Sequence, residues 1–195
     1  MKIIRTLMLT TAIGLGMGAT AFAQDAASTD TQRDVNQQDR IEQGLQSGQL
    51  STGEAARLEQ GEARIDRIES NADRNGTVSP AEQTRIDNAQ NRESNAIYDD
   101  KHNAVTGNPE SASSQRMQAD VQRDADQQSR IEQGINSGSL NNSQVSRLES
   151  GQAHDSRIQA RAGANGNVSA REQRRAQLAE NRQSRHIYHA KHPTP

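Results

Sequence analysis

The sequence contains no cysteine and no tryptophan, and its single phenylalanine is Phe22. Without cysteine, disulfide bonds, cysteine-ligated zinc sites and cysteine nucleophiles are all excluded. Beyond Phe22, only Tyr98 and Tyr188 carry aromatic rings. Because aromatic side chains supply much of the area that an ordinary core buries, we expect a thin core.

Apolar residues and charge of one sign are also scarce. Hydrophobic residues make up 30% of the chain, the mean hydropathy is −1.02 and the formal net charge is −2. The absence of a basic patch argues against a nucleic-acid partner. The chain has no glycine-rich phosphate loop and no HExxH motif, and no spacing of Ser, His and Asp singles out a catalytic triad. We therefore expect a protein without enzymatic activity.

The only long apolar run lies near the N-terminus, from Leu7 to Thr20, after two basic residues. The tripeptide "AFA" at 21–23 is typical of a signal-peptidase site, which makes residues 1–23 a signal peptide and Gln24 the first mature residue. The run is too short to span a bilayer as a helix. We expect a secreted or periplasmic protein with no transmembrane segment in the mature chain.

Long segments of the chain match one another at a constant offset of 90 residues. "RDVNQQDRIEQGLQSGQL" (33–50) matches "RDADQQSRIEQGINSGSL" (123–140), and "NRESNAIYDDKH" (91–102) matches "NRQSRHIYHAKH" (181–192). A repeat this long indicates a duplicated small domain rather than a solenoid, and we expect each copy to fold alone. The predicted organisation is a flexible N-terminus (24–32), a first helical unit (33–102), a linker (103–119), a second unit (120–192) and a tail (193–195).

The segments between the turns are rich in Gln, Glu, Arg and Ala and lack internal proline, which favours helices. No segment alternates apolar and polar residues for long enough to be a strand, so the predicted fold class is all-α. The rings of Tyr98 and Tyr188 are expected to close the core. One helix face is marked by Ala55, Leu58, Ile65 and Ile68, and its counterpart by Val145, Leu148 and Ile158.

Four turns share one pattern, of which "NGTVSPAE" (75–82) is an example. Each contains a glycine suited to positive φ, followed two residues later by Leu or Val and then by a capping residue. In this interpretation the polar residues only end one helix and begin the next, and no metal is required. The glycines are Gly48, Gly76, Gly138 and Gly166, and the predicted capping boxes are Ser51 with Glu54, Ser79 with Glu82, and Ser169 with Glu172.

The stretch "NADRNGTVSPAE" (71–82) also resembles the calcium loop of the EF-hand family. The resemblance implies paired EF-hand-like units and a weak Ca²⁺ site. The other three loops depart from the family pattern, with Leu45, Ile135 and Arg161 at ligand positions, so one ion per chain is expected. The implied metal ligands are Asn71, Asp73, Asn75, Thr77, Ser79 and Glu82, with Gly76 at the turn.

A histidine cluster offers a different chemistry. His186, His189 and His192 lie at intervals of three residues, which suits either transition-metal binding or a polar helix end that complements the helix dipole. The leading hypothesis is an exported, weakly calcium-binding or calcium-responsive interaction protein. The alternatives are a metal-independent helical envelope stress or chaperone-like protein, and a histidine-based metal buffer. In each case the sequence leaves a protein partner unnamed.

Overall fold

The computed structural model describes residues 18–192, and side chains from residue 26 onward. Over this range the chain is helical and contains no strand, which confirms the all-α prediction. No described helix has the length and apolarity that crossing a membrane requires. The helices are α1 (Gly18–Ser47), α2 (Thr52–Ala72), the short 3₁₀ helix η1 (Asp73–Asn75), α3 (Pro80–Lys101), α4 (Ala112–Asn136), α5 (Asn142–Gly163) and α6 (Ala170–Lys191).

The predicted boundaries differ from the observed helices at the N-terminus and at the linker. Most of the predicted signal peptide lies outside the described residues, and Gln24 lies within α1. The stretch 24–32, predicted to be a flexible N-terminus, is part of α1. The non-helical part of the predicted linker ends at Ser111, because α4 begins at Ala112. Each half of the chain supplies three long helices.

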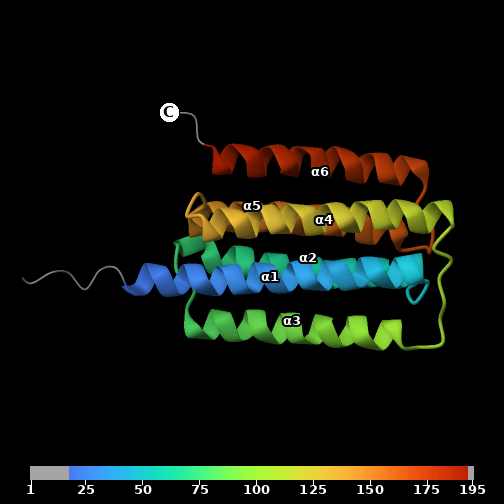
Figure 1. Ribbon diagram of the computed structural model, residues 1–195, viewed down its shortest axis with the longest axis horizontal. Helices are drawn as coiled ribbons and strands as arrows, with labels where there is room; N and C mark the ends of the chain where they lie inside the picture. The colour runs from blue at the N-terminus through green and yellow to red at the C-terminus, as the bar shows by residue number, and fades with distance from the viewer. Residues whose placement is uncertain (1–17, 193–195) are drawn as a thin grey trace, which may run out of the picture.

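The helices lie side by side in a bundle, with α3 and α6 at opposite edges (Figure 1). The most extensive contacts join α1 to α4 and α2 to α5, so each half packs mainly on the other half. Two apolar clusters form at the two ends of these pairs. One includes Ile41 and Leu45 of α1 with Met117 and Val121 of α4. The other joins Ala27 of α1 to the far end of α4. Separating the halves would expose part of each cluster to water.

The α1–α4 contact follows a heptad-like spacing of alternating three and four residues, the spacing that keeps one helix face on its partner. Its ends are apolar, but its middle is polar. In α1 the buried series is Ala27, Thr31, Asp34, Gln38, Ile41 and Leu45, and in α4 it is Met117, Val121, Asp124, Gln128, Ile131 and Ile135. The centre of the bundle is therefore a buried polar layer between two apolar ends.

The four turns have the expected local geometry. All four glycines have positive φ, between 70° and 85°. The three predicted capping boxes are present, and Asn141 with Gln144 forms a fourth. Leu50, Leu140 and Val168 are buried after their glycines, so the apolar residue of the pattern fills the core beneath each of these turns.

The prediction that the tyrosine rings close the core is wrong. Ile97 and Ile187 are fully buried, but the neighbouring Tyr98 and Tyr188 are 58% and 55% exposed. The two rings point outward and stack on His102 and His192. A helical residue next to a core position faces away from the core, because successive side chains are about 100° apart around the axis.

Candidate functional site

The polar layer contains many carboxyl groups and no buried base. Among the described residues that are buried, none is Lys, Arg or His. Burying a carboxylate without a paired charge is costly, so the buried acids that have no basic partner must take up protons or cations. The buried acids are Asp30, Asp34, Glu54, Glu59, Glu62, Asp66, Glu69, Asp73, Glu93, Asp120, Asp124, Glu149, Asp155 and Glu180.

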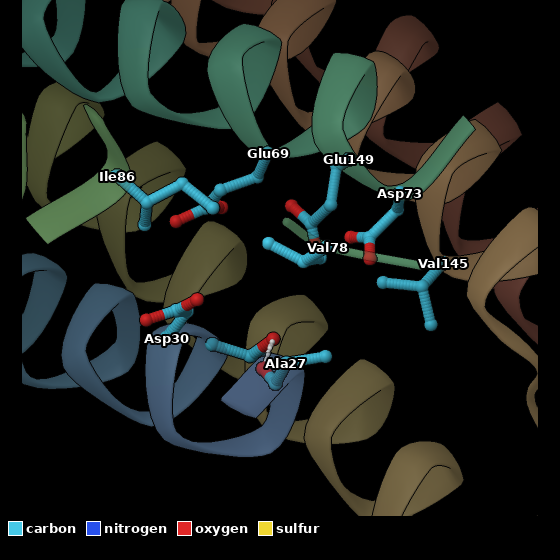
Figure 2. Close-up of a pocket in the computed structure, with 9 residues that line it drawn as sticks. Ala27, Asp30, Glu69, Asp73, Val78, Ile86, Val145 and Glu149 are labelled. Carbon is cyan, nitrogen blue, oxygen red and sulfur yellow. Dashed lines mark hydrogen bonds between the residues drawn. The ribbon is translucent and has the colours of Figure 1, made fainter. Parts of the chain in front are cut away.

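Six of these acids gather at one end of the polar layer, and we refer to them as the six-carboxyl cluster. Figure 2 shows four of them around a small cavity, contributed by α1, α2, η1 and α5. The cavity has a volume of about 10 Å³, which is close to the space that one water molecule or ion occupies. The cluster consists of Asp30, Glu69, Asp73 and Glu149 at the cavity, with Asp34 and Asp66 beside Glu69.

Three carboxyl groups of this cluster converge closely enough to share one ion. One oxygen each from Asp34, Asp66 and Glu69 lies within 4.8 Å of the other two. In the described part of the chain, no other group of three acids or histidines meets this condition. Two oxygens on opposite sides of a Ca²⁺ ion are about 4.6 to 5.2 Å apart, given Ca–O distances of about 2.3 to 2.6 Å. The spacing therefore suits a hard cation with oxygen ligands.

Glutamine side chains orient these carboxyl groups. The Nε2 of Gln90 donates to Asp34 Oδ1 at 2.9 Å and to Glu69 Oε1 at 3.0 Å. The Nε2 of Gln128 donates to Asp66 Oδ1 at 3.2 Å and to Glu149 Oε2 at 3.3 Å. Each amide holds one oxygen of each carboxyl group, and Ser156 Oγ donates to the second oxygen of Asp66 at 3.4 Å.

Several of these second oxygens have no hydrogen-bond partner although they are buried. They include Asp34 Oδ2, Asp73 Oδ1 and Glu149 Oε1. Burial raises the pKa of Asp34 and of Asp73 to about 7, and it raises the pKa of Glu69 well above its ordinary value. Neighbouring carboxyl groups raise the pKa of Glu69 further. The cluster therefore binds protons tightly, and a cation at the same oxygens would displace them.

A second group of acids, the four-carboxyl cluster, lies on the α4 side of the polar layer. Gln159 Nε2 donates to Asp124 Oδ2 at 2.8 Å and to Glu180 Oε1 at 3.3 Å. Unlike the first cluster, this one has a cation at its edge, because Arg123 Nη1 lies 3.1 Å from Glu180 Oε2. Its members are Glu59, Asp120, Asp124 and Glu180.

Of the six ligands predicted in the 71–82 loop, only Asp73 lines the cavity. Asn71 Oδ1 accepts from Arg74 at 2.7 Å, and Asn75 Oδ1 accepts from the Thr77 backbone N–H at 3.0 Å. Glu82 Oε2 accepts from the Ser79 backbone N–H at 2.9 Å and from its hydroxyl at 2.6 Å. The loop thus places one carboxyl group, that of Asp73, in the interior. Val78 of the same loop also lines the cavity.

The three C-terminal histidines do not come together as one group. His192 stacks on Tyr188 with ring centroids 4.5 Å apart, and His189 meets the same ring edge-on at 5.6 Å. His186 lies instead in a groove between α5 and α6.

Sequence reasoning missed Asp34, Asp66, Glu69 and Glu149, because acidic residues on a helix are usually solvated. A signal for Asp34 was present in the spacing of α1. Asp34 lies on the three-and-four series that includes Ala27, Ile41 and Leu45, which places it on the buried face.

The chain matches no family model, no curated protein and no solved structure.

Proposed function

We propose that this protein binds one hard divalent cation, Ca²⁺ in the first instance, within the six-carboxyl cluster, and that it does so as an exported protein. The observation that carries the proposal is the convergence of three buried carboxyl groups, those of Asp34, Asp66 and Glu69, while none of the described Lys, Arg and His residues is buried. All the side-chain donors are oxygens, and oxygen ligands favour Ca²⁺, Mg²⁺ and Mn²⁺ over the softer metals. Asp73, which belongs to the 71–82 loop, is a member of the same cluster.

Among these ions we expect Ca²⁺ to bind best. Mg²⁺ demands near-ideal octahedral geometry and usually keeps several of its waters. A cavity of about 10 Å³ leaves little room for them. Ca²⁺ accepts carboxylates in variable geometry, so the free oxygens of Asp34 and Glu149 can complete its shell after small movements.

Calorimetric titration of the chain from Gln24 onward with CaCl₂ at pH 7.5 tests this proposal. We expect one ion per chain, with a Kd on the order of 10⁻⁴ M, as in extracellular calcium modules. Asp34→Asn and Glu69→Gln each remove one ligand charge while keeping the side-chain shape, and each should weaken binding by at least about tenfold.

Two controls separate loss of binding from loss of folding. Removing a buried carboxyl group should raise the melting temperature of the calcium-free protein at pH 7.5, so a weakly binding variant would still be folded. Asp124→Asn removes the carboxyl group that stands 90 residues after Asp34 and should leave calcium affinity unchanged. Absence of binding heat in the unmodified chain, or an equal loss in Asp124→Asn, would overturn the proposal.

A further inference from the structure

A surface groove of about 310 Å³ lies between α5 and α6, away from the six-carboxyl cluster. Four basic side chains line it: Arg147 and His154 from α5, and Arg182 and His186 from α6. All four are exposed. No Phe, Tyr or Trp side chain lines the groove, so we expect a ligand to be held there mainly by charge and hydrogen bonds.

The corresponding face between α2 and α3 shows how the arginines of the groove differ. Arg57 Nη2 lies 3.8 Å from Glu54 Oε1 and 3.5 Å from Asp100 Oδ2. Arg147 stands 90 residues after Arg57, but a glutamine and Ala190 stand where the two acids would be. None of the ion pairs in the described part of the chain includes Arg147. Its guanidinium group is therefore available to a ligand.

The other exchanges in the lining act in both directions. Gln183 replaces the buried acid Glu93 and His186 replaces Ala96, which favours positive charge, whereas His154 replaces Arg64 and Asp155 replaces Ile65. The one acid in the lining is Asp155, which is buried. Burial raises the pKa of Asp155 to about 7, so near neutral pH it offsets only part of the positive charge.

The pKa of His154 reflects this positive charge. Its pKa is lowered, first by partial burial and then by Arg157, Arg182 and Arg161. Two of these arginines lie on its own helix and the third lies on α6 across the groove. An anion placed among them would reverse the effect and raise the pKa of His154.

We propose that this groove binds a phosphate-type anion, held by the guanidinium groups of Arg147 and Arg182. The planar fork of a guanidinium group matches two oxygens of a phosphate, and the pair faces the groove from its two walls. His154 and His186 supply additional N–H donors when protonated. This site is independent of the proposed calcium site, because it shares no residue with the six-carboxyl cluster.

The test is a titration of the calcium-free chain with inorganic phosphate at constant ionic strength, followed through the histidine C–H signals in proton NMR. The His154 and His186 signals should shift saturably and the pKa of His154 should rise, while the His102 signal should not shift. Arg182→Gln should weaken phosphate binding by about tenfold, the loss expected for one charge-assisted contact. Arg92→Gln, at the matching position of the first half, should leave binding unchanged.

Ala190→Asp gives a sharper variant, because it provides Arg147 with the partner that Asp100 provides for Arg57. The first half already accommodates an aspartate there, so the fold should tolerate it. We expect phosphate binding to fall about tenfold in this variant. The proposal is overturned if the histidine shifts stay linear up to about 50 mM phosphate, a range that would reveal even millimolar affinity. Equal weakening by Arg92→Gln and Arg182→Gln would also overturn it.

Discussion

The two carboxyl clusters lie at corresponding positions of the two halves, and in each a glutamine donates to one aspartate and one glutamate. The positions of this glutamine and of the glutamate are exchanged between the halves. At 69 and 90 the chain has Glu and Gln, whereas at 159 and 180 it has Gln and Glu. Gln90 on α3 therefore does in one cluster what Gln159 on α5 does in the other. Each of these two pairs thus keeps one amide donor, because a carboxylate has no proton to donate.

The clusters differ in total charge. Ser156 and Gly163 stand 90 residues after Asp66 and Asp73, so the four-carboxyl cluster lacks these two acids. It also has Arg123 paired with Glu180, whereas Arg33, the counterpart of Arg123, lies 3.8 Å from Asp87. The six-carboxyl cluster therefore has more acids, and none of them forms an ion pair with a base in the described part of the chain, although the charge of Arg33 offsets part of the rise in the pKa of Asp30 and Asp34. This difference makes it the better candidate for a metal site.

Positions 66 and 156 meet across the α2–α5 contact. Ser156 Oγ donates to Asp66 Oδ2 at 3.4 Å. Two aspartates at these positions would place two carboxyl groups against each other. A serine on one side supplies a donor instead, so the pair tolerates a single acid.

The largest expected effect is on the pH dependence of stability. Burial raises the pKa of Asp34 from 3.8 to about 7 and that of Glu59 from 4.5 to about 8. A carboxyl group with a raised folded-state pKa binds its proton more tightly when folded. Its stabilising effect is complete below the unfolded pKa and is lost as pH rises through the folded pKa. Without calcium, the melting temperature should fall by at least about 10 °C between pH 5 and pH 8.

Substitutions at position 66 and at its counterpart 156 should change this pH dependence in opposite directions. Asp66→Ser should make the pH dependence shallower, because it removes one acid from the six-carboxyl cluster. Ser156→Asp should make it steeper by placing a second acid against Asp66. Identical pH profiles for the two variants would show that the interior acids do not control stability. Thermal unfolding followed by circular dichroism from pH 4 to 9 provides the data.

A double-mutant cycle at positions 69 and 90 tests whether the amide and the acid can be exchanged between these two positions. Its expected effect on stability is the second largest. Gln90→Glu leaves Asp34 and Glu69 without their shared donor and adds a third acid. We expect it to cost roughly 3 kcal/mol at pH 8 in urea unfolding. The double variant Glu69→Gln, Gln90→Glu reproduces the arrangement at 159 and 180, so it should recover most of this loss. If the two changes are simply additive, the amide does not act as a shared donor.

The features predicted correctly from the sequence are local ones. Helix class, the four glycine turns and the capping boxes depend on residues within a few positions of one another, as with Ser79 and Glu82. The pairing of α1 with α4 depends on contacts across the two halves, which periodicity does not specify. A spacing of three and four shows which face of a helix is buried but not which helix covers it.

The candidate site was predicted only in part, for a related reason. Asp73 was identified from its place in the 71–82 loop, but Asp34 and Glu149 lie on other helices, far away in sequence. In two of the four turns the residue that follows the glycine by two positions is a leucine, Leu50 or Leu140. Both leucines are buried in the apolar clusters, so core packing accounts for this position in those turns.

The smallest effect is expected at Glu82, which separates the two interpretations of the 71–82 loop. Glu82 bonds to the backbone N–H and the hydroxyl of Ser79, and these hydrogen bonds lower its pKa. Glu82→Gln keeps an oxygen that accepts the backbone bond, so the melting temperature should change by no more than about 2 °C. Calcium affinity should also remain the same, because Glu82 does not line the cavity. Asp73→Asn, from the same loop, should instead weaken calcium binding by about tenfold, because it removes a charge from the cavity wall. The reverse result, with calcium binding lost in Glu82→Gln and kept in Asp73→Asn, would move the site from the bundle interior to an EF-hand-like loop.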